Sequence, residues 1–348
     1  MLTGAILLGG RKEKLAHFFA KALCYLTFIE TTFFFFRFFL TSLSSRTKRI
    51  YKNLVTIRNH EMVLFLRNNS FVFEFRTKSG DMLCSSIYVN PRRDQPRNLF
   101  SLKLGSNNVG SALFDVNGII SLAFFSETSM YHGTELYNAF SELFKMPLRE
   151  VQINLDDAAV ATYRCWITWN NELFYDVPLL TIQGKCSFSN YIWILENVRT
   201  RHRLYFGVEP TEYPNNPETV EILVGGIEAI AILHGRWINI EQLKLLKIQN
   251  ITIQEVSLTD IQINRFLRNW RDSGVASDWK QLDIHFNRAA NLDIVLEGIE
   301  VTDEDEIRPA DVIHQWSFNT GNGKKCTACY ANYVADFLQF GFEFRFGN

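Results

Sequence analysis

Two cysteines near the end of the chain, Cys326 and Cys329, have the spacing of a metal or redox site. A Cys-x-x-Cys pair supplies half of the ligands of a structural zinc ion, and the other two normally come from a second pair. The sequence has no second such pair, and His314 is the nearest imidazole. Because the surrounding segment has the pattern of a strand, the two thiols are expected on opposite faces. We therefore expect reduced, buried cysteines and no bound metal.

Other residues with chemical potential lack the partners that catalysis needs. Asp156-Asp157 and the acidic run from Asp303 to Glu306 have no neighbour in the sequence that would fix an acid–base pair, so solvated turns are expected. No Gly-x-Ser-x-Gly motif is present, and no glycine-rich segment has the spacing and lysine of a phosphate loop. The sequence predicts a protein that is not an enzyme and has no cofactor.

Tryptophans spread through the later region favour binding to a protein over binding to a nucleic acid. They are Trp166, Trp169, Trp193, Trp237, Trp270 and Trp279. Basic residues do not alternate with them densely, and the formal net charge of the chain is −1, which argues against a polyanion partner. We expect most of these rings in the core and a minority exposed on a sheet face as anchors for a protein partner.

The elements that position these residues change along the chain. Residues 58–128 alternate apolar and polar positions, with Asn117-Gly118 as a hairpin signal, which predicts a small antiparallel β region. From residue 129 onward, short apolar strands such as Leu179–Ile182 and Leu245–Ile253 are each followed by a helix. This pattern predicts an α/β (α+β) fold whose later part is a stack of leucine-rich-repeat-like strand–helix units with a curved sheet.

The strongest helix prediction lies between residues 258 and 274. Thr259 and Gln262 have the spacing of a capping box, which predicts a helix start at this point. The apolar residues Ile263, Phe266, Leu267 and Trp270 fall on one face of that helix. A following glycine, Gly274, supplies a stop signal.

This stretch resembles the type 2 F-box-associated domain found in a large nematode family of F-box proteins. The resemblance rests on Leu258, Thr259, Asn264, Phe266, Leu267, Trp270 and Gly274. It extends from Gly235-Arg-Trp237 through Leu296-Glu-Gly-Ile299, and more loosely over most of the chain after Leu40. These are mostly packing residues, so the resemblance concerns fold and kinship more than chemistry.

The segment 40–57 resembles the last third of an F-box, and its front two-thirds are absent. Leu40, Leu43, Ile50 and Leu54 fit the F-box pattern and are its candidate partner-binding residues. The resemblance implies docking to the Skp-type linker subunit of a cullin ubiquitin ligase. A basic amphipathic helix that packs on its own domain is the alternative.

Residues 1–39 form an aberrant apolar segment without the charge order of a signal peptide. The stretch from Ala22 to Leu43 is apolar enough to be considered as a membrane helix. Against this, Glu30 and Arg37 would each cost on the order of 3 kcal/mol near a bilayer centre. A phenylalanine run that ends in arginine also fits translated intron sequence, because phenylalanine codons are pyrimidine-rich. A membrane span is the less favoured reading.

We expect four parts: the apolar segment 1–39, the partial F-box-like helical remnant 40–57, a β meander 58–128, and an F-box-associated, repeat-like domain 129–348 with its core motif at 235–299. The resemblance implies a non-enzymatic substrate-recognition adaptor of an SCF-type ubiquitin ligase that binds an unknown protein target through the C-terminal domain. The alternatives are a protein-interaction domain that does not recruit the ligase and a membrane-anchored protein. Six unevenly spaced cysteines suit a reducing compartment, cytoplasmic or nuclear.

Overall fold

The computed structural model describes residues 60–67, 70–77, 82–90, 100–104, 107–116, 119–125, 129–144, 147–156, 158–213, 226–273, 279–303, 312–319, 325–335 and 337–346. They form two compact units, the first from the described parts of Met1–Leu64 and Ser70–Pro147 and the second from those of Phe65–Asn69 and Leu148–Asn348. Within these residues, no helix combines the length and apolar character that a bilayer crossing requires. The apolar stretch 22–43 lies outside the described residues, so its reading stays a prediction.

The first unit is a strand meander with one helix. Its elements are β1 (His60–Arg67), β2 (Ser70–Thr77), β3 (Met82–Asn90), β4 (Phe100–Leu104), β5 (Asn107–Val116), β6 (Ile119–Phe125) and α3 (Ser129–Phe144). The strands lie in the order β1-β2-β3-β6-β5-β4. The β2–β3, β5–β6 and β4–β5 pairs are antiparallel, and the β3–β6 pair is parallel. Val116 pairs with Ile119, which places a hairpin at the predicted turn. Gly133 lets α3 approach β2 closely, since an added Cβ would lie 2.7 Å from the Phe71 ring.

The second unit alternates strands and helices and ends in antiparallel strands. Its elements are β7 (Leu148–Asn154), α4 (Val160–Leu173), β8 (Leu179–Cys186), α5 (Phe188–Asn197), β9 (Arg203–Pro210), β10 (Ala229–Ile232), α6 (Ile240–Leu245), β11 (Asn250–Ile253), α7 (Asp260–Ser273), β12 (Gln281–Phe286), α8 (Leu292–Val295), β13 (Thr302–Asp303), β14 (Val312–Asn319), β15 (Lys325–Ala335) and β16 (Phe337–Phe346). The mixed α/β class predicted from the sequence is confirmed.

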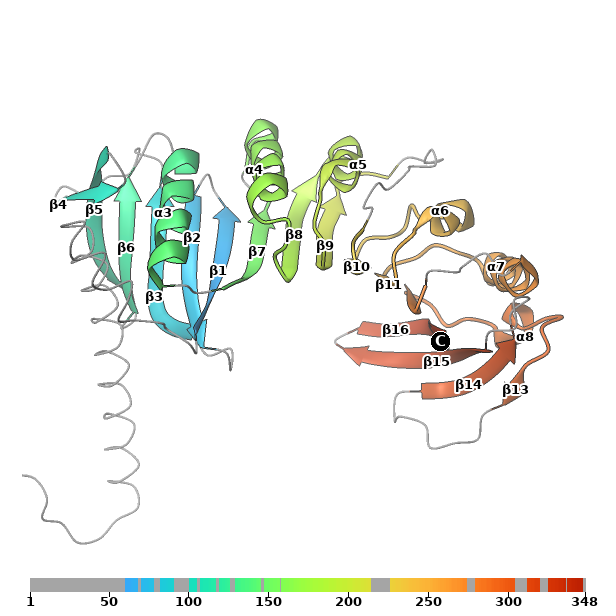
Figure 1. Cartoon of the computed structure of the whole chain (residues 1–348). Helices are drawn as coiled ribbons and strands as arrows, with labels where there is room; N and C mark the ends of the chain where they lie inside the picture. The colour runs from blue at the N-terminus through green and yellow to red at the C-terminus, as the bar shows by residue number, and fades with distance from the viewer. Residues whose placement is uncertain are drawn as a thin grey trace, which may run out of the picture. The chain divides into compact units, whose positions relative to one another are not determined.

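Strands β7 to β12 pair in chain order, and every neighbouring pair is parallel. Their registers align buried apolar side chains in rows that cross the sheet. One row holds Leu180, Leu204, Ile230, Ile251 and Leu282. Figure 1 shows α4, α5 and α6 on the same side of these strands, so the buried rows form the core between the sheet and its helices.

One predicted strand is too long at its start. The expected strand Leu245–Ile253 begins only at Asn250, because Leu245 is the last residue of α6. Leu246 and Ile248 are still buried, so the apolar pattern in the sequence continues from the helix into the strand.

The unit boundary falls after Pro147 and thus groups α3 with the first unit. The predicted domain boundaries at residues 39, 57 and 128 stay predictions.

The helix predicted around residue 266 is α7, and its capping box forms. The backbone N–H of Thr259 donates to Gln262 Oε1 at 2.8 Å, and the Gln262 N–H donates to Thr259 Oγ1 at 3.3 Å. The predicted face, Ile263, Phe266, Leu267 and Trp270, is buried. The helix ends at Ser273, directly before Gly274, which lies outside the described residues.

Trp270 joins α7 to the C-terminal strands. Its ring meets Phe318 of β14 edge-on at 5.7 Å and Phe344 of β16 edge-on at 6.1 Å between ring centroids. Phe266 and Trp279 complete the cluster. Such aromatic pairs each contribute about 0.5–1.5 kcal/mol beyond the area they bury. The cluster therefore holds the end of the parallel sheet to the antiparallel strands.

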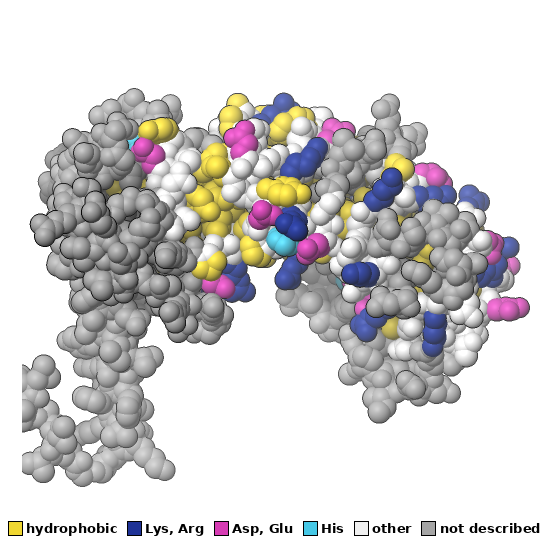
Figure 2. All heavy atoms as spheres, viewed as in Figure 1, with side chains coloured by type: hydrophobic (Ala, Val, Ile, Leu, Met, Phe, Trp, Pro, Cys, Tyr) yellow, Lys and Arg dark blue, Asp and Glu magenta, His cyan; other side chains and the backbone are white. Residues whose placement is uncertain are grey.

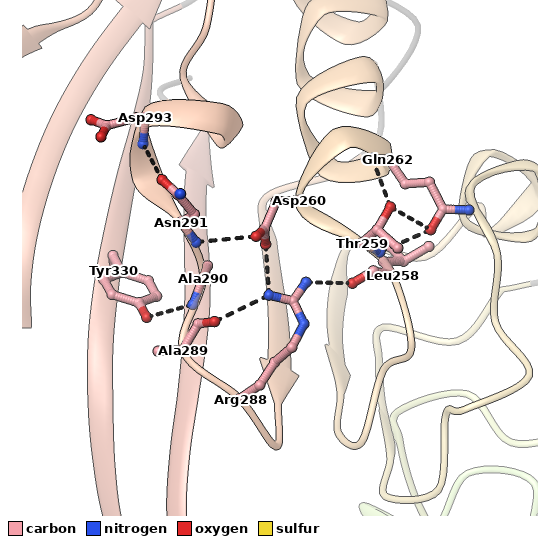
Figure 3. A network of polar contacts seen from close by, with 10 residues as sticks. All are labelled: Leu258, Thr259, Asp260, Gln262, Arg288, Ala289, Ala290, Asn291, Asp293 and Tyr330. Atoms are coloured by element: carbon pink, nitrogen blue, oxygen red, sulfur yellow. Dashed lines mark hydrogen bonds and ion pairs between the residues drawn. The ribbon is translucent and has the colours of Figure 1, made fainter.

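A polar network fixes the start of α7 to the segment after β12 (Figure 3). Arg288 donates to Asp260 Oδ1 at 2.7 Å and to the Leu258 carbonyl at 2.9 Å. The second oxygen of Asp260 accepts the Asn291 N–H at 3.2 Å, and Tyr330 Oη accepts the Ala290 N–H at 3.0 Å. The acidic side chain also lies at the helix N-terminus, where negative charge is favoured.

Asn264 bridges α7 to α8. Its Nδ2 donates to the carbonyls of Val295 at 2.9 Å and Glu297 at 2.8 Å.

Replacing Asn264 with Ala removes both donors from these carbonyls, and we expect the free energy of unfolding to fall by about 1–3 kcal/mol. Urea unfolding of the full chain measures this change. The matched variant Arg265→Ala, at an exposed position of the same helix, should change stability by less than about 0.5 kcal/mol. An equal loss in both variants would contradict the bridging role.

Candidate protein-binding face

The face of the parallel sheet opposite α4, α5 and α6 presents the outward residues of each strand. In β9 to β12 the burial of side chains alternates strictly, with each buried residue followed by one that is partly or fully exposed. Parallel sheets are usually covered on both faces. We call this surface, made by the outward residues of β7 to β12 and β16, the open face.

Among the residues of the open face whose burial the structure describes, Tyr205 is the most exposed aromatic residue, with 39% of its surface accessible. It stands beside Gly207, because an added Cβ there would lie 3.4 Å from the Tyr205 ring and 3.3 Å from Leu233. Ala231 pairs with Tyr205 in register on the neighbouring strand. An aromatic and a leucine side chain thus flank a floor of small residues. We call these four residues the Tyr205 patch.

Two carboxylates lie directly opposite each other farther along the open face. Asp283 of β12 pairs in register with Glu343 of β16. Gln281 Nε2 donates to Asp283 Oδ2 at 3.0 Å and to Glu343 Oε1 at 3.3 Å, and Thr252 Oγ1 donates to Asp283 at 3.2 Å. Arg345 forms an ion pair with Glu343. Burial, and then the negative charge of Glu343, raise the pKa of Asp283 to about 6.

Charged pairs line the edge where the parallel strands end. Lys185 Nζ lies 2.7 Å from Glu209, and Glu255 lies 3.0 Å from His234 Nδ1 and 3.3 Å from Arg236 Nε. Glu255 has a φ of 56°, the left-handed region that a residue with a side chain rarely adopts. The chain packs tightly just before Glu255. There the Gly235 N–H donates to the Gln254 carbonyl, and a Cβ on residue 235 would clash with that oxygen. These groups neutralise one another at the edge.

The tryptophans are not on the open face, so the expectation of exposed indole anchors there is wrong. Six of the seven, with Trp316 among them, are at most 8% exposed. Trp193 is half-buried on α5, under the guanidinium of Arg164 at 4.4 Å. Two buried indoles donate to partners inside: Trp237 Nε1 donates to Tyr191 Oη and Trp279 Nε1 to the Leu246 carbonyl. Large rings fill the space between helices and sheet, and a tyrosine takes the exposed position.

Cys326 and Cys329 lie in β15 as buried cysteines that are not part of a disulfide. Burial raises the pKa of the Cys326 thiol above its ordinary value. His314 stacks on Trp316 at 5.7 Å between ring centroids. Among the described residues, no group of three or more His, Cys, Asp or Glu side chains is placed to hold a metal ion.

The residues that carried the family resemblance are brought together around α7. Leu258, Phe266, Leu267 and Trp270 are buried, while Thr259 and Asn264 make the capping and bridging contacts. The candidate linker-binding residues Leu40, Leu43, Ile50 and Leu54 lie outside the described residues, and their role stays a proposal.

The residues of the open face were not predicted from the sequence. Tyr205 had a local signal, because Leu204, Phe206 and Val208 alternate with it and must face the core. The Asp283–Glu343 pair had no local signal in the sequence, since the two residues meet only through the β12–β16 pairing.

Figure 2 shows acidic, basic and hydrophobic side chains interspersed over the described surface on the face in view.

Comparison with known proteins gives one family. Residues 218–292 match the family described as F-box associated. The match covers β10, α6, β11, α7 and β12, and with them Ala231, Leu233 and Asp283. The comparisons with curated proteins and with solved structures each gave no significant match.

Asp283 should make stability depend on pH. Its folded pKa, about 6, lies above the ordinary value of 3.8, so the folded protein keeps a proton that the unfolded chain releases. Stability contributed by this group is therefore present at low pH and lost as pH rises through about 4 to 6. We expect Asp283→Asn to unfold with a free energy roughly 1–2 kcal/mol higher than wild type at pH 7.5, after allowance for the partial exposure of the group. The difference should vanish near pH 4.

Urea unfolding at both pH values measures this effect. Glu297→Gln, at an exposed position with no ion pair among the described residues, is the control and should change stability by less than about 0.5 kcal/mol at either pH. An Asp283→Asn variant whose stability difference is the same at both pH values would contradict the assignment.

Proposed function

We propose that this chain is a non-enzymatic substrate-recognition adaptor of an SCF-type ubiquitin ligase, and that it binds its protein target on the open face of the second unit. The observation that carries the proposal is that the F-box associated match, residues 218–292, contributes several strands of that face. F-box associated domains serve in target binding, and the resemblance of 40–57 to part of an F-box supports the ligase role.

The chemistry of the open face suits a protein partner. Binding energy at protein interfaces concentrates in a few residues, often tyrosine, that a rim of near-neutral contacts shields from water. Tyr205 with its small-residue floor fits such a centre, and the self-paired charges Lys185–Glu209 and His234–Glu255–Arg236 fit a polar rim. The mixed signs of these charges do not favour a nucleic acid.

A bulky charge in the centre of the patch should weaken target binding. Ala231→Arg places a guanidinium beside Tyr205, and we expect a captured target to bind at least ten times more weakly. Ile261→Arg is the matched control, since Ile261 is 63% exposed on α7, away from the open face. It should leave affinity within about two-fold of wild type. Proteins captured from cell extract by all three chains are compared, and each candidate is then purified for direct titration.

Both variants must first show cooperative unfolding like that of wild type. If no purified protein distinguishes Ala231→Arg from Ile261→Arg, the open face is not the target-binding surface.

The ligase role has its own test. We expect the full chain to bind a purified Skp-type linker subunit, and Leu43→Asp with Leu54→Asp to weaken that binding at least ten-fold, because apolar side chains of the F-box-like helix would make the contact. Ser44→Asp with Lys52→Asp is a matched change at polar positions of the same segment. Absence of linker binding by the wild-type chain would contradict the adaptor role and favour the alternative, a target-binding protein that does not recruit the ligase.

A further inference from the structure

The open face combines an apolar patch and a carboxylate pair at a fixed separation. Ala231, in the Tyr205 patch, lies on β10, and Asp283 lies in the same cross-sheet row on β12. Two strand spacings of about 4.8 Å separate them, which is roughly 10 Å. Thr252 fills the position between them on β11. An extended chain rises about 3.3 Å per residue, so roughly three residues span this distance.

The negative charge of the Asp283–Glu343 pair is only partly neutralised by its neighbours. The pair carries two negative charges when ionised, and Arg345 offsets one of them through its contact with Glu343. The other neighbours, Thr252 and Gln281, donate hydrogen bonds but carry no charge. Burial and Glu343 together raise the pKa of Asp283, so ionisation at neutral pH reduces stability. Unfavourable charge that is retained at a surface is typical of functional sites.

We propose that the open face binds an extended segment of the target that carries an apolar side chain and, two or three residues away, a lysine or arginine. The apolar side chain packs on the Tyr205 patch, and the cation lies between Asp283 and Glu343. This inference rests on the proposed function and specifies the chemistry of the target. Other cations of the face are already engaged or distant: Arg345 pairs with Glu343, and Arg203 lies on β9, three strands from Asp283.

A peptide selection with the full chain tests the inference. The probe is a library of randomised 12-residue peptides. Peptides selected by the wild-type chain should be enriched several-fold over the input in an apolar residue followed at the second or third position by lysine or arginine. A selected peptide should bind Asp283→Asn/Glu343→Gln at least ten times more weakly and should lose binding to Ala231→Arg.

Replacing the lysine of that peptide with acetyl-lysine gives a double-mutant cycle. Acetylation removes the charge and keeps most of the side chain. It should weaken binding to wild type at least ten-fold and leave binding to the double variant nearly unchanged. Because the cycle compares two peptides on each chain, a difference in folding between the chains cancels.

The outcomes separate this inference from the proposed function. Peptides that lose binding to Ala231→Arg, yet show no basic enrichment or bind the double variant as tightly as wild type, would overturn the inference and leave the open face as the binding surface. If neither peptides nor protein targets respond to Ala231→Arg, both are overturned.

Discussion

Parallel pairing of consecutive strands is the constraint on which the second unit depends. A strand that is parallel to the one before it needs a crossover, and helices supply it between β7 and β8, between β8 and β9, and between β10 and β12. Because α4, α5 and α6 lie on one side (Figure 1), apolar rows gather under them and the outward residues form the opposite surface. The core and the candidate binding face are thus two sides of one sheet.

Local sequence patterns correctly predicted the features that depend on residues close together in the chain. The capping box of Thr259 and Gln262, the buried stripe that includes Phe266, and the alternating strands were all predictable, because each depends on neighbours within a turn or a strand. The extent of β11 was not, since Leu245 and Ile253 are both apolar but belong to different elements. The core position of most tryptophans was predicted correctly, but the exposure of a minority on a sheet face was wrong, because the space between helices and sheet takes the largest rings.

The candidate site was hardest to predict where it depends on pairing between distant segments. Asp283 and Glu343 are sixty residues apart in the sequence and meet because β16 turns back along β12. The family match covers Asp283 but not Tyr205 or Glu343. The polar contacts of Asn264 and Asp260, which lie within the match, hold α7 and the following segment in place. They therefore fix α7 against the segment that follows β12.

Hydroxyl-radical footprinting of the full chain, with and without a bound target, shows which side of the sheet the target covers. It reports the solvent exposure of individual side chains on both sides of the sheet. If the target binds on the open face, Tyr205 and Leu233 lose reactivity on binding, while the exposed helix residues Ile261 and Leu245 keep theirs. Protection of Ile261 and Leu245 with unchanged reactivity at Tyr205 would place the target on the helices and not on the open face.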